Sequence, residues 1–320
     1  MKYIINESIS INETLKKCKP GDIIYLKNGL YKEKVDIMIN NVCIIGESID
    51  HTIITNHDFY HKIMPDYNEC NTFRTYSCYV GADNVEISNL TIQNSSVPSY
   101  KYGQAVALHA DGNNFKCTNV KLESAQDTLF TGPLPADLIE RHKGFLRDCF
   151  RKNNKSIQVY KDCTIIGDVD FIFGSAQALF LNCDIISISR HPKATGPDGY
   201  ICAPSHPYED KFGYLFYKCN LIKQDGVNNV FLGRPWRDYG TAAFIDCKMN
   251  SHINPKGFDK WANTNRDKTA RFYEYTENID LTNREPWIKL MTKDEAIKYV
   301  NDYYEYIKYE EKYCVPNKLD

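Results

Sequence analysis

The chain has 320 residues, of which 42% are hydrophobic and 25% are charged, and its formal net charge is −2 at pH 7. This composition is typical of a globular protein, and the nearly neutral charge gives no support to nucleic-acid binding. No apolar run has the length of a membrane span, so we expect no membrane association either.

The first residues do not have the layout of a secretion signal. After Lys2, the short apolar stretch Tyr3–Ile5 ends at Asn6, and no small-residue cleavage site follows. We therefore expect a cytoplasmic protein if the sequence is complete. The alternative is a secreted protein whose signal has been removed.

A short helix is the first predicted element. Ser10 and Glu13 have the spacing of a capping box, and the apolar residues after them recur at helical spacing. A proline-glycine pair ends this helix. A strand is predicted over Asp22–Leu26, followed by a turn at Asn28 and Gly29.

The middle of the chain alternates between short β-branched or aliphatic runs and turns, with no long helical pattern between them. Few of the turns have the Asn-Gly signature of antiparallel hairpins. The strands predicted in this way are Val42–Ile45, Thr52–Thr55, Val85–Ile87, Leu90–Ile92, Val120–Leu122, Thr164–Ile166, Leu179–Leu181, Asp184–Ile188, Tyr214–Tyr217, Leu221–Lys223 and Ala243–Asp246.

A local pattern recurs along these strands, with a polar residue placed just before an apolar run. Cys163, Cys183, Cys219 and Cys247 occupy equivalent positions in it, and the spacing between successive copies is irregular. Propellers and leucine-rich arrays keep a stricter period, whereas irregular stacked coils are typical of a parallel β-helix. We predict one all-β domain over residues 1–320, without a linker.

The chain has twelve cysteines, an even number that would permit disulfides. Their recurring position instead predicts that each sulfur packs as a small apolar group, and no C-x-x-C pair indicates zinc. We therefore expect free thiols, as in a reducing compartment.

The C-terminal part changes character. Ser251–Arg271 has the composition of a loop, and Ala296, Ile297 and Val300 among charged neighbours predict an amphipathic helix over Thr292–Tyr304. We expect the apolar face of this helix to pack against the side of the strand array.

The sequence GDVDFIFG, over Gly167–Gly174, has the strongest chemical content. It places Asp170 in a run of apolar residues. A carboxylate is unfavourable there unless it has a charge partner or a role in a functional site. An aspartate that caps a turn at the end of a strand is the structural alternative. Three other segments argue against that alternative, namely GQAVAL (Gly103–Leu108), QDTL (Gln126–Leu129) and LGRPW (Leu232–Trp236).

These four motifs, in this order, resemble those of the pectin methylesterases, or pectinesterases, a family of carbohydrate esterases. A weaker fifth match is GLYKE (Gly29–Glu33), and TARFYEY (Thr269–Tyr275) is similar to the ending of the family. The resemblance runs from about Ile11 to about Tyr299, which is nearly the whole chain. It implies a single-stranded right-handed parallel β-helix with short N- and C-terminal helices.

The residues themselves favour carboxylate chemistry over a serine nucleophile. There is no G-x-S-x-G motif, and Ser175 lacks the flanking glycine. Asp127 in QDTL lies 43 residues before Asp170, and stacked coils can bring such distant residues onto one face. Two neighbouring carboxylates cannot both ionise freely, so that one can donate a proton while the other attacks.

The resemblance implies a role for each polar residue of the motifs. Asp170 would be the nucleophile, and Asp127 would be the general acid and then the general base. Gln104 and Gln126 match the pair of amides that stabilises the oxyanion, and Arg234 matches the arginine that orients the nucleophile. The structural alternatives are ladder amides for the two glutamines and a structural ion pair for the arginine.

Three aromatic residues match substrate-binding positions of the family. Trp236 would stack on a sugar face, with a core residue as the alternative, and Phe173 and Phe130 would line the groove. His57 and His61 are four residues apart, but no third ligand is near them in the sequence, and we expect them at the surface. Neither a metal nor an organic cofactor is implied.

The sequence departs from the family pattern between the two aspartates. The inserted loop covers about Thr131–Gln158 and contains TGPLP followed by a basic stretch. Our hypothesis is that it forms a wall of the groove, where it contacts uronate carboxylates or narrows the site toward short oligomers. A solvated loop that contacts nothing is the alternative. His109 also follows QAVAL where many relatives have arginine.

The sequence therefore predicts a carboxylic ester hydrolase of the aspartyl esterase type. It would act in pectin degradation and cell wall modification on methyl-esterified galacturonan or oligogalacturonides. The products would be a free carboxylate and methanol, formed through an acyl-enzyme intermediate. We expect a monomer.

Three alternatives remain at this point. A calcium-dependent polysaccharide lyase would need a cluster of carboxylates, which we do not find beside Asp170 in the sequence. A non-catalytic carbohydrate-binding β-helix would need neither aspartate. An esterase for another acyl ester, such as an acetyl group, would use the same residues.

Overall fold

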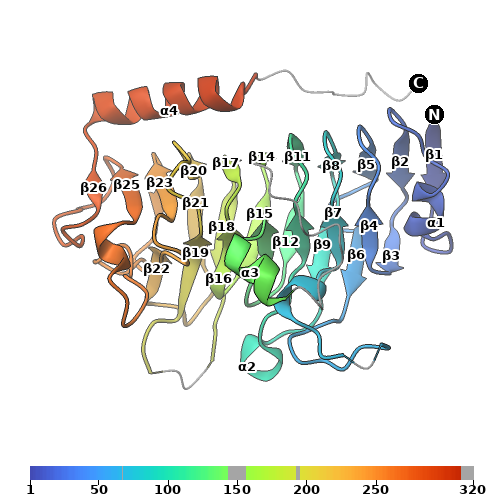
Figure 1. Ribbon diagram of the computed structural model, residues 1–320, viewed down its shortest axis with the longest axis horizontal. Helices are drawn as coiled ribbons and strands as arrows, with labels where there is room; N and C mark the ends of the chain where they lie inside the picture. The colour runs from blue at the N-terminus through green and yellow to red at the C-terminus, as the bar shows by residue number, and fades with distance from the viewer. Residues whose placement is uncertain (67, 143–155, 192–194, 311–320) are drawn as a thin grey trace.

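Short parallel strands joined by tight bends wind the chain into stacked coils, which Figure 1 shows side by side along the long axis. The computed structural model describes residues 1–66, 68–142, 156–191 and 195–310. Within these residues the strands form three sheets of 11, 8 and 7 strands. The strands named below pair in parallel throughout. The predicted all-β parallel β-helix is confirmed.

Sheet A has 11 strands, and in spatial order they are β1 (Lys2–Ile5), β2 (Ile23–Leu26), β5 (Cys43–Gly46), β8 (Glu86–Ser88), β11 (Phe115–Thr118), β14 (Ile157–Lys161), β17 (Gln177–Leu181), β20 (Tyr214–Tyr217), β23 (Thr241–Ile245), β25 (Arg271–Tyr275) and β26 (Lys289–Leu290). Sheet B has 8 strands, in the order β24 (Lys248–Met249), β21 (Asn220–Lys223), β18 (Asp184–Ser187), β15 (Thr164–Gly167), β12 (Lys121–Glu123), β9 (Thr91–Asn94), β6 (Thr52–Asn56) and β3 (Gly29–Lys32).

Sheet C has 7 strands, in the order β22 (Val230–Gly233), β19 (Gly199–Pro204), β16 (Val169–Gly174), β13 (Leu129–Thr131), β10 (Leu108–Ala110), β7 (Cys78–Val80) and β4 (Val35–Ile37). The described helices are α1 (Ile11–Leu15), α2 (Ser99–Tyr102), α3 (Ala136–Arg141) and α4 (Lys293–Ile307), with 3₁₀ turns at Thr72–Arg74 and Arg266–Lys268. None of these helices is long and apolar enough to cross a membrane.

The recurring polar residue of the sequence marks the bend between sheets A and B. In six coils this residue has a positive φ, which asparagine and aspartate tolerate better than most residues. The bends also stack, because the Asn119 side-chain amide donates to the Asn89 Oδ1 of the previous coil over 2.9 Å. The residues concerned are Asn89, Asn119, Asp162, Asn182, Lys218 and Asp246, with φ between 52° and 58°.

The cysteines that follow these bends point into the interior of the β-helix. Cys163, Cys183, Cys219 and Cys247 are buried free thiols, as predicted. Each sulfur donates a hydrogen bond to a backbone carbonyl of the preceding coil, at 3.3–3.4 Å. The thiols therefore fill a narrow interior position and also satisfy their own polar group.

A helix lies near each end of the described chain. At α1, the Ser10 hydroxyl accepts from the Glu13 N–H, which is one half of the predicted capping box. The other acceptor is the Glu33 carboxylate, which receives the N–H groups of Ile11 and Asn12. Asn28 forms a bend as predicted, but Gly29 already begins β3.

At the C-terminal end, α4 begins at Lys293 with a complete capping box on Thr292 and packs against the outer face of sheet A (Figure 1). The helix runs to Ile307, further than predicted, and it buries Ala296, Val300, Tyr303 and Ile307. Ile297 had been predicted on the apolar face, but its side chain is 52% exposed. The buried residues follow one another at spacings of four, three and four, so they share one face of the helix. Ile297 lies on the far side of Val300 from the centre of that face.

Candidate active site

Three of the four motifs lie at the neighbouring strands β10, β13 and β16 of sheet C, and LGRPW lies at β22, two strands beyond β16. Asp170 is in β16, and Asp127 comes two residues before β13, the next strand of the sheet. The ladder pairs Leu129 with Ile172 and Phe130 with Phe173, so the two aspartates come from adjacent coils. This register, rather than nearness in the sequence, brings the two carboxylates together.

Both aspartates sit at irregular points of the backbone. The φ angle is 65° at Asp127 and 48° at Asp170, and the ladder between β16 and β19 shifts register between Val169 and Ile172. A non-glycine residue in the left-handed region is strained and persists where the surrounding structure enforces it, most often at functional sites. Both side chains line the same cavity.

Arg234, which directly follows β22, holds the Asp170 carboxylate in a fork. Its Nε donates to Oδ1 over 2.9 Å and its Nη2 donates to Oδ2 over 2.7 Å. The guanidinium lies between two aromatic rings, 3.9 Å from the Tyr200 centroid and 4.2 Å from that of Trp261. Arg234 therefore fixes the orientation of the Asp170 carboxylate, and the two rings in turn hold the guanidinium in place.

Burial has different outcomes at the two carboxylates. It raises the pKa of Asp127 well above its usual value, and the neighbouring charge of Asp170 raises it further. Burial also raises the pKa of Asp170, but the hydrogen bonds and charge of Arg234 oppose this rise. Burial and the Asp170 charge thus favour the protonated form of Asp127, whereas Arg234 favours the charged form of Asp170.

Gln104 and Gln126 form an isolated parallel bridge between adjacent coils, and both line the cavity. Each is half-buried. The Ala105 N–H donates to the Gln126 carbonyl over 3.1 Å, and the Tyr60 N–H donates to the Gln104 carbonyl over 2.9 Å. Two neutral amides are therefore placed side by side next to the aspartates.

The aromatic residues of the motifs divide into two groups. Phe173 and Trp236 line the cavity, with ring centroids 5.6 Å apart and an edge-on arrangement. Phe130 does not line it: the residue is fully buried and packs 4.9 Å from Phe173 and 5.3 Å from Phe73. The expectation that Phe130 lines the groove is therefore wrong, because Phe173 and the loop with Phe73 cover it.

The cavity has a volume of about 690 Å³, and several of its residues have no signal in the sequence. Tyr60 and Phe73 come from the loop between β6 and β7, and Trp261 and Arg266 come from the segment predicted as a loop. For these residues, the only indication in the sequence was that Trp261 is an isolated tryptophan in a polar segment. Asn71, Thr72, Ala203 and Arg237 are further residues of this kind. Asp137, Leu138, Arg141 and His142 also line the cavity, and they belong to the inserted loop that the sequence hypothesis placed at the groove.

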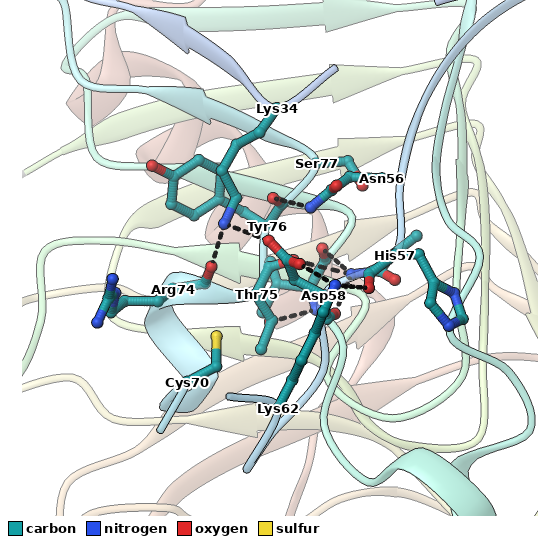
Figure 2. A network of polar contacts seen from close by, with 12 residues as sticks. Lys34, Asn56, His57, Asp58, Lys62, Cys70, Arg74, Thr75, Tyr76 and Ser77 are labelled. Atoms are coloured by element: carbon teal, nitrogen blue, oxygen red, sulfur yellow. Dashed lines mark hydrogen bonds and ion pairs between the residues drawn. The ribbon is translucent and has the colours of Figure 1, made fainter. Parts of the chain in front are cut away.

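The loop between β6 and β7 is anchored by a network of polar contacts around Asp58, which Figure 2 shows. The Lys34 and Lys62 ammonium groups each donate to the Asp58 carboxylate over 2.7 Å. Burial alone would raise the pKa of Asp58, but the charges and hydrogen bonds of these lysines lower it below its usual value. Lys34 also donates to the Arg74 carbonyl and lies 4.7 Å from the Tyr76 ring. The loop therefore forms a fixed wall of the cavity.

A second anchor lies on the other side of Gln104. Asp168 is buried, and its carboxylate accepts hydrogen bonds from the Ser99 hydroxyl and from the Val169 N–H. Burial raises the pKa of Asp168 to about 6. Because Ser99 begins α2, which leads into Gln104, this contact ties the amide segment to the start of β16.

Among the described residues, no group of three or more histidine, cysteine, aspartate or glutamate side chains is arranged to hold a metal ion. His57 contacts the hydroxyls of Ser95 and Ser96, and His61 contacts Glu69. Both histidine contacts are at exposed or partly buried positions and lie outside the cavity lining.

The comparisons with known proteins agree with one another. The family model of the pectinesterases matches residues 3–150 and 144–307. The probable pectinesterase/pectinesterase inhibitor 23 of Arabidopsis thaliana is 27% identical over 92% of this chain and 48% of its own length, so this chain spans about half of that relative.

Two solved structures extend this similarity to three dimensions. Pectin methylesterase PemA from Erwinia chrysanthemi has a TM-score of 0.76 and 25% identity, over 93% of this chain and 94% of that one. A pectin methylesterase in complex with a hexasaccharide has a TM-score of 0.74 and 26% identity, over 91% of this chain and 90% of that one.

Proposed function

Because the chain belongs to the pectinesterase family, we propose that it hydrolyses the methyl esters of galacturonan chains to free carboxylates and methanol. The observation that carries the proposal is the pairing of Asp170, held by the Arg234 fork, with Asp127, whose pKa is raised well above its usual value. The similarity to a structure with a bound hexasaccharide supports a carbohydrate ligand for this cavity.

In the proposed first half-reaction, the Asp170 carboxylate attacks the ester carbonyl carbon. The carbonyl oxygen becomes an oxyanion, which accepts hydrogen bonds from the side-chain amides of Gln104 and Gln126. When the tetrahedral intermediate collapses, Asp127 gives its proton to the departing methoxy oxygen, and methanol leaves. An acyl-enzyme anhydride on Asp170 remains.

In the second half-reaction the roles of Asp127 reverse. Its carboxylate, now ionised, takes a proton from water, and the hydroxide attacks the acyl carbonyl carbon. The Asp170 carboxylate is released and Asp127 is protonated again, so the net change is one ester and one water converted to one acid and one methanol. Arg234 orients Asp170 and favours its ionised form before the attack and again after its release from the anhydride.

The test is methanol release from highly methylated polygalacturonate and from a methylated hexagalacturonide. We expect release by the wild type, and a loss of about a thousandfold or more in Asp170→Asn and in Asp127→Asn, with the folded state verified by circular dichroism. Asp302→Asn, which removes an exposed ion pair of α4 with Lys298, is the control and should keep its activity. Full activity in Asp170→Asn, or no release by the folded wild type, would contradict the proposal.

A further inference from the structure

The short helix α3 stands over the cavity, and it comes from the inserted loop. Figure 1 shows it in front of the middle of the β-helix. Asp137, Leu138, Arg141 and His142 from this helix and its end line the cavity. Leu138 is buried in the same apolar cluster as Phe73 and Phe173. This described part of the insertion is thus a wall of the site, as the sequence hypothesis expected; residues 143–155 lie outside the described residues.

The start of α3 is fastened to the loop that follows β22. Arg237 forks the Asp137 carboxylate, with Nε to Oδ1 at 3.1 Å and Nη2 to Oδ2 at 2.7 Å. The same guanidinium lies 4.7 Å from the ring centroid of Trp236, and Arg141 adds a longer contact to Asp137 at 3.4 Å. The helix is therefore joined directly to the tryptophan side of the cavity.

The end of α3 meets the opposite part of the cavity. The His142 ring packs edge-on against Phe73, with centroids 6.1 Å apart. Phe73 belongs to the 3₁₀ turn just before β7, in the loop that the Asp58 network anchors. The attachments of α3 thus lie next to β7 and β22, which are five strand positions apart in sheet C. The strands of both aspartates lie between β7 and β22 in sheet C.

This arrangement places α3 along one side of the space above the reactive carboxylates. Phe173, which would be a floor for a sugar ring, is only 3% exposed. The cavity volume of about 690 Å³ falls within the range of about 300–1,000 Å³ that is usual for sites that take up small ligands. A long polymer that enters at an internal ester needs a groove that is open on both sides of that ester, whereas a short oligomer needs only a pocket.

We propose that α3 shortens the substrate cleft and makes short methylated oligogalacturonides the preferred substrate over internal esters of long chains. The inference rests on the proposed esterase function and names the substrate size for the same site. Asp137 and Arg237 are specificity-determining residues in this proposal, because their ion pair holds the wall in place.

The experiment compares kcat/KM per methyl ester on a methylated hexagalacturonide and on highly methylated polygalacturonate. For the wild type we expect a preference of about tenfold or more for the hexamer. In Asp137→Asn/Leu138→Ala, which loosens α3, this ratio should fall at least about threefold because turnover of the polymer rises. Asp302→Asn is the matched control for loss of an exposed ion pair, and its ratio should equal that of the wild type.

Equal turnover of the two substrates by the wild type would overturn the inference and leave the esterase in place. An unchanged ratio in the folded double variant would also overturn it. If the double variant does not fold, Asp137→Asn alone gives the same comparison, because it removes a charge at a half-exposed side chain and leaves buried Leu138 in place. If neither substrate released methanol, the proposed function itself would be contradicted. That result is distinct from equal release from both substrates.

Discussion

At the scale of single residues, two side chains of the same type acquire different properties from their neighbours. Asp127 and Asp170 are 8% and 7% exposed, so both are similarly removed from water. The difference is the Arg234 fork, which bonds both oxygens of Asp170. A carboxylate with that partner favours its charged form, while a buried carboxylate beside it favours its neutral form.

The first prediction concerns Arg234→Gln, which removes the charge and keeps an amide. Without the guanidinium, the pKa of Asp170 should rise further above its usual value, because burial is no longer opposed. A nucleophilic carboxylate loses activity as the pH falls through its pKa, so the acid limb of the kcat/KM profile should move to higher pH. We also expect turnover at neutral pH to fall about a hundredfold or more.

The pH profile of Arg266→Gln is the control for this measurement. Arg266 lines the cavity and lies 5.8 Å from the Trp261 ring, but its hydrogen bonds go to Asp238 and to the Pro235 carbonyl. Its acid limb should therefore match that of the wild type. An acid limb that is unchanged in Arg234→Gln would show that this cation does not control the ionisation of Asp170.

At the scale of elements, the sequence predicted most strands of sheet B and about half of those of sheet A, but none of those of sheet C. β5 and β15 alternate between buried and half-buried residues, which is the pattern that sequence analysis detects. Every residue of β16 and of β19 is buried, because one face lies inside the β-helix and the other lies under the walls of the cavity. The strands that carry the site were located only by their motifs.

The walls of the cavity were largely beyond prediction for a different reason. Asp137 and Arg237 are 100 residues apart, and neither has a local pattern that would pair it with the other. The same is true of Lys34 and Asp58, which meet only after the coils have stacked. Candidate site residues in motifs can thus be proposed from the sequence, whereas the contacts that shape the space around them depend on the register of distant coils.

The second prediction tests the wall formed by the loop between β6 and β7. Asp58→Asn leaves the Lys34 and Lys62 cations without their carboxylate, and the loop should shift the Tyr60 N–H that bonds the Gln104 carbonyl. Because a small displacement of an oxyanion amide has a large effect on rate, kcat should fall about tenfold, with a smaller change in KM. Stability should fall by about 1–3 kcal/mol.

Asp66→Asn is the matched control, since it removes an ion pair with Arg74 in the same loop at a more exposed position. We expect little change in kcat or stability for this variant. Steady-state kinetics and chemical denaturation of both variants give the comparison. Equal effects of Asp58→Asn and Asp66→Asn would mean that the network around Asp58 has no special role in placing Gln104.

At the scale of the whole molecule, the coils depend on one another for their stability. A single coil cannot bury its own apolar face, so the core exists only where neighbours stack. Rings from four successive coils form one column inside the β-helix, with Tyr160, Phe180, Phe216 and Phe244 stacked at centroid distances of 4.9, 4.5 and 4.3 Å. The parallel architecture follows from this repetition, and irregular spacing in the sequence was enough to predict it.

The third prediction is that Phe216→Ala destabilises the protein by about 3–5 kcal/mol, because it removes a fully buried ring with neighbours on both sides. The midpoint of chemical denaturation measures the effect. Tyr100→Ala, at a ring that is 59% exposed, should leave the midpoint nearly unchanged. A loss below about 1 kcal/mol for Phe216→Ala would indicate that the coils tolerate a void without coupling to their neighbours.

The row of interior cysteines can report where the stack of coils opens. Each of these sulfurs belongs to a different coil and is buried, so an alkylating reagent can reach it only when that coil separates from the next. The order in which the cysteines are alkylated therefore shows which coils along the axis separate first. In their order along the axis, these positions are Cys163, Cys183, Cys219 and Cys247.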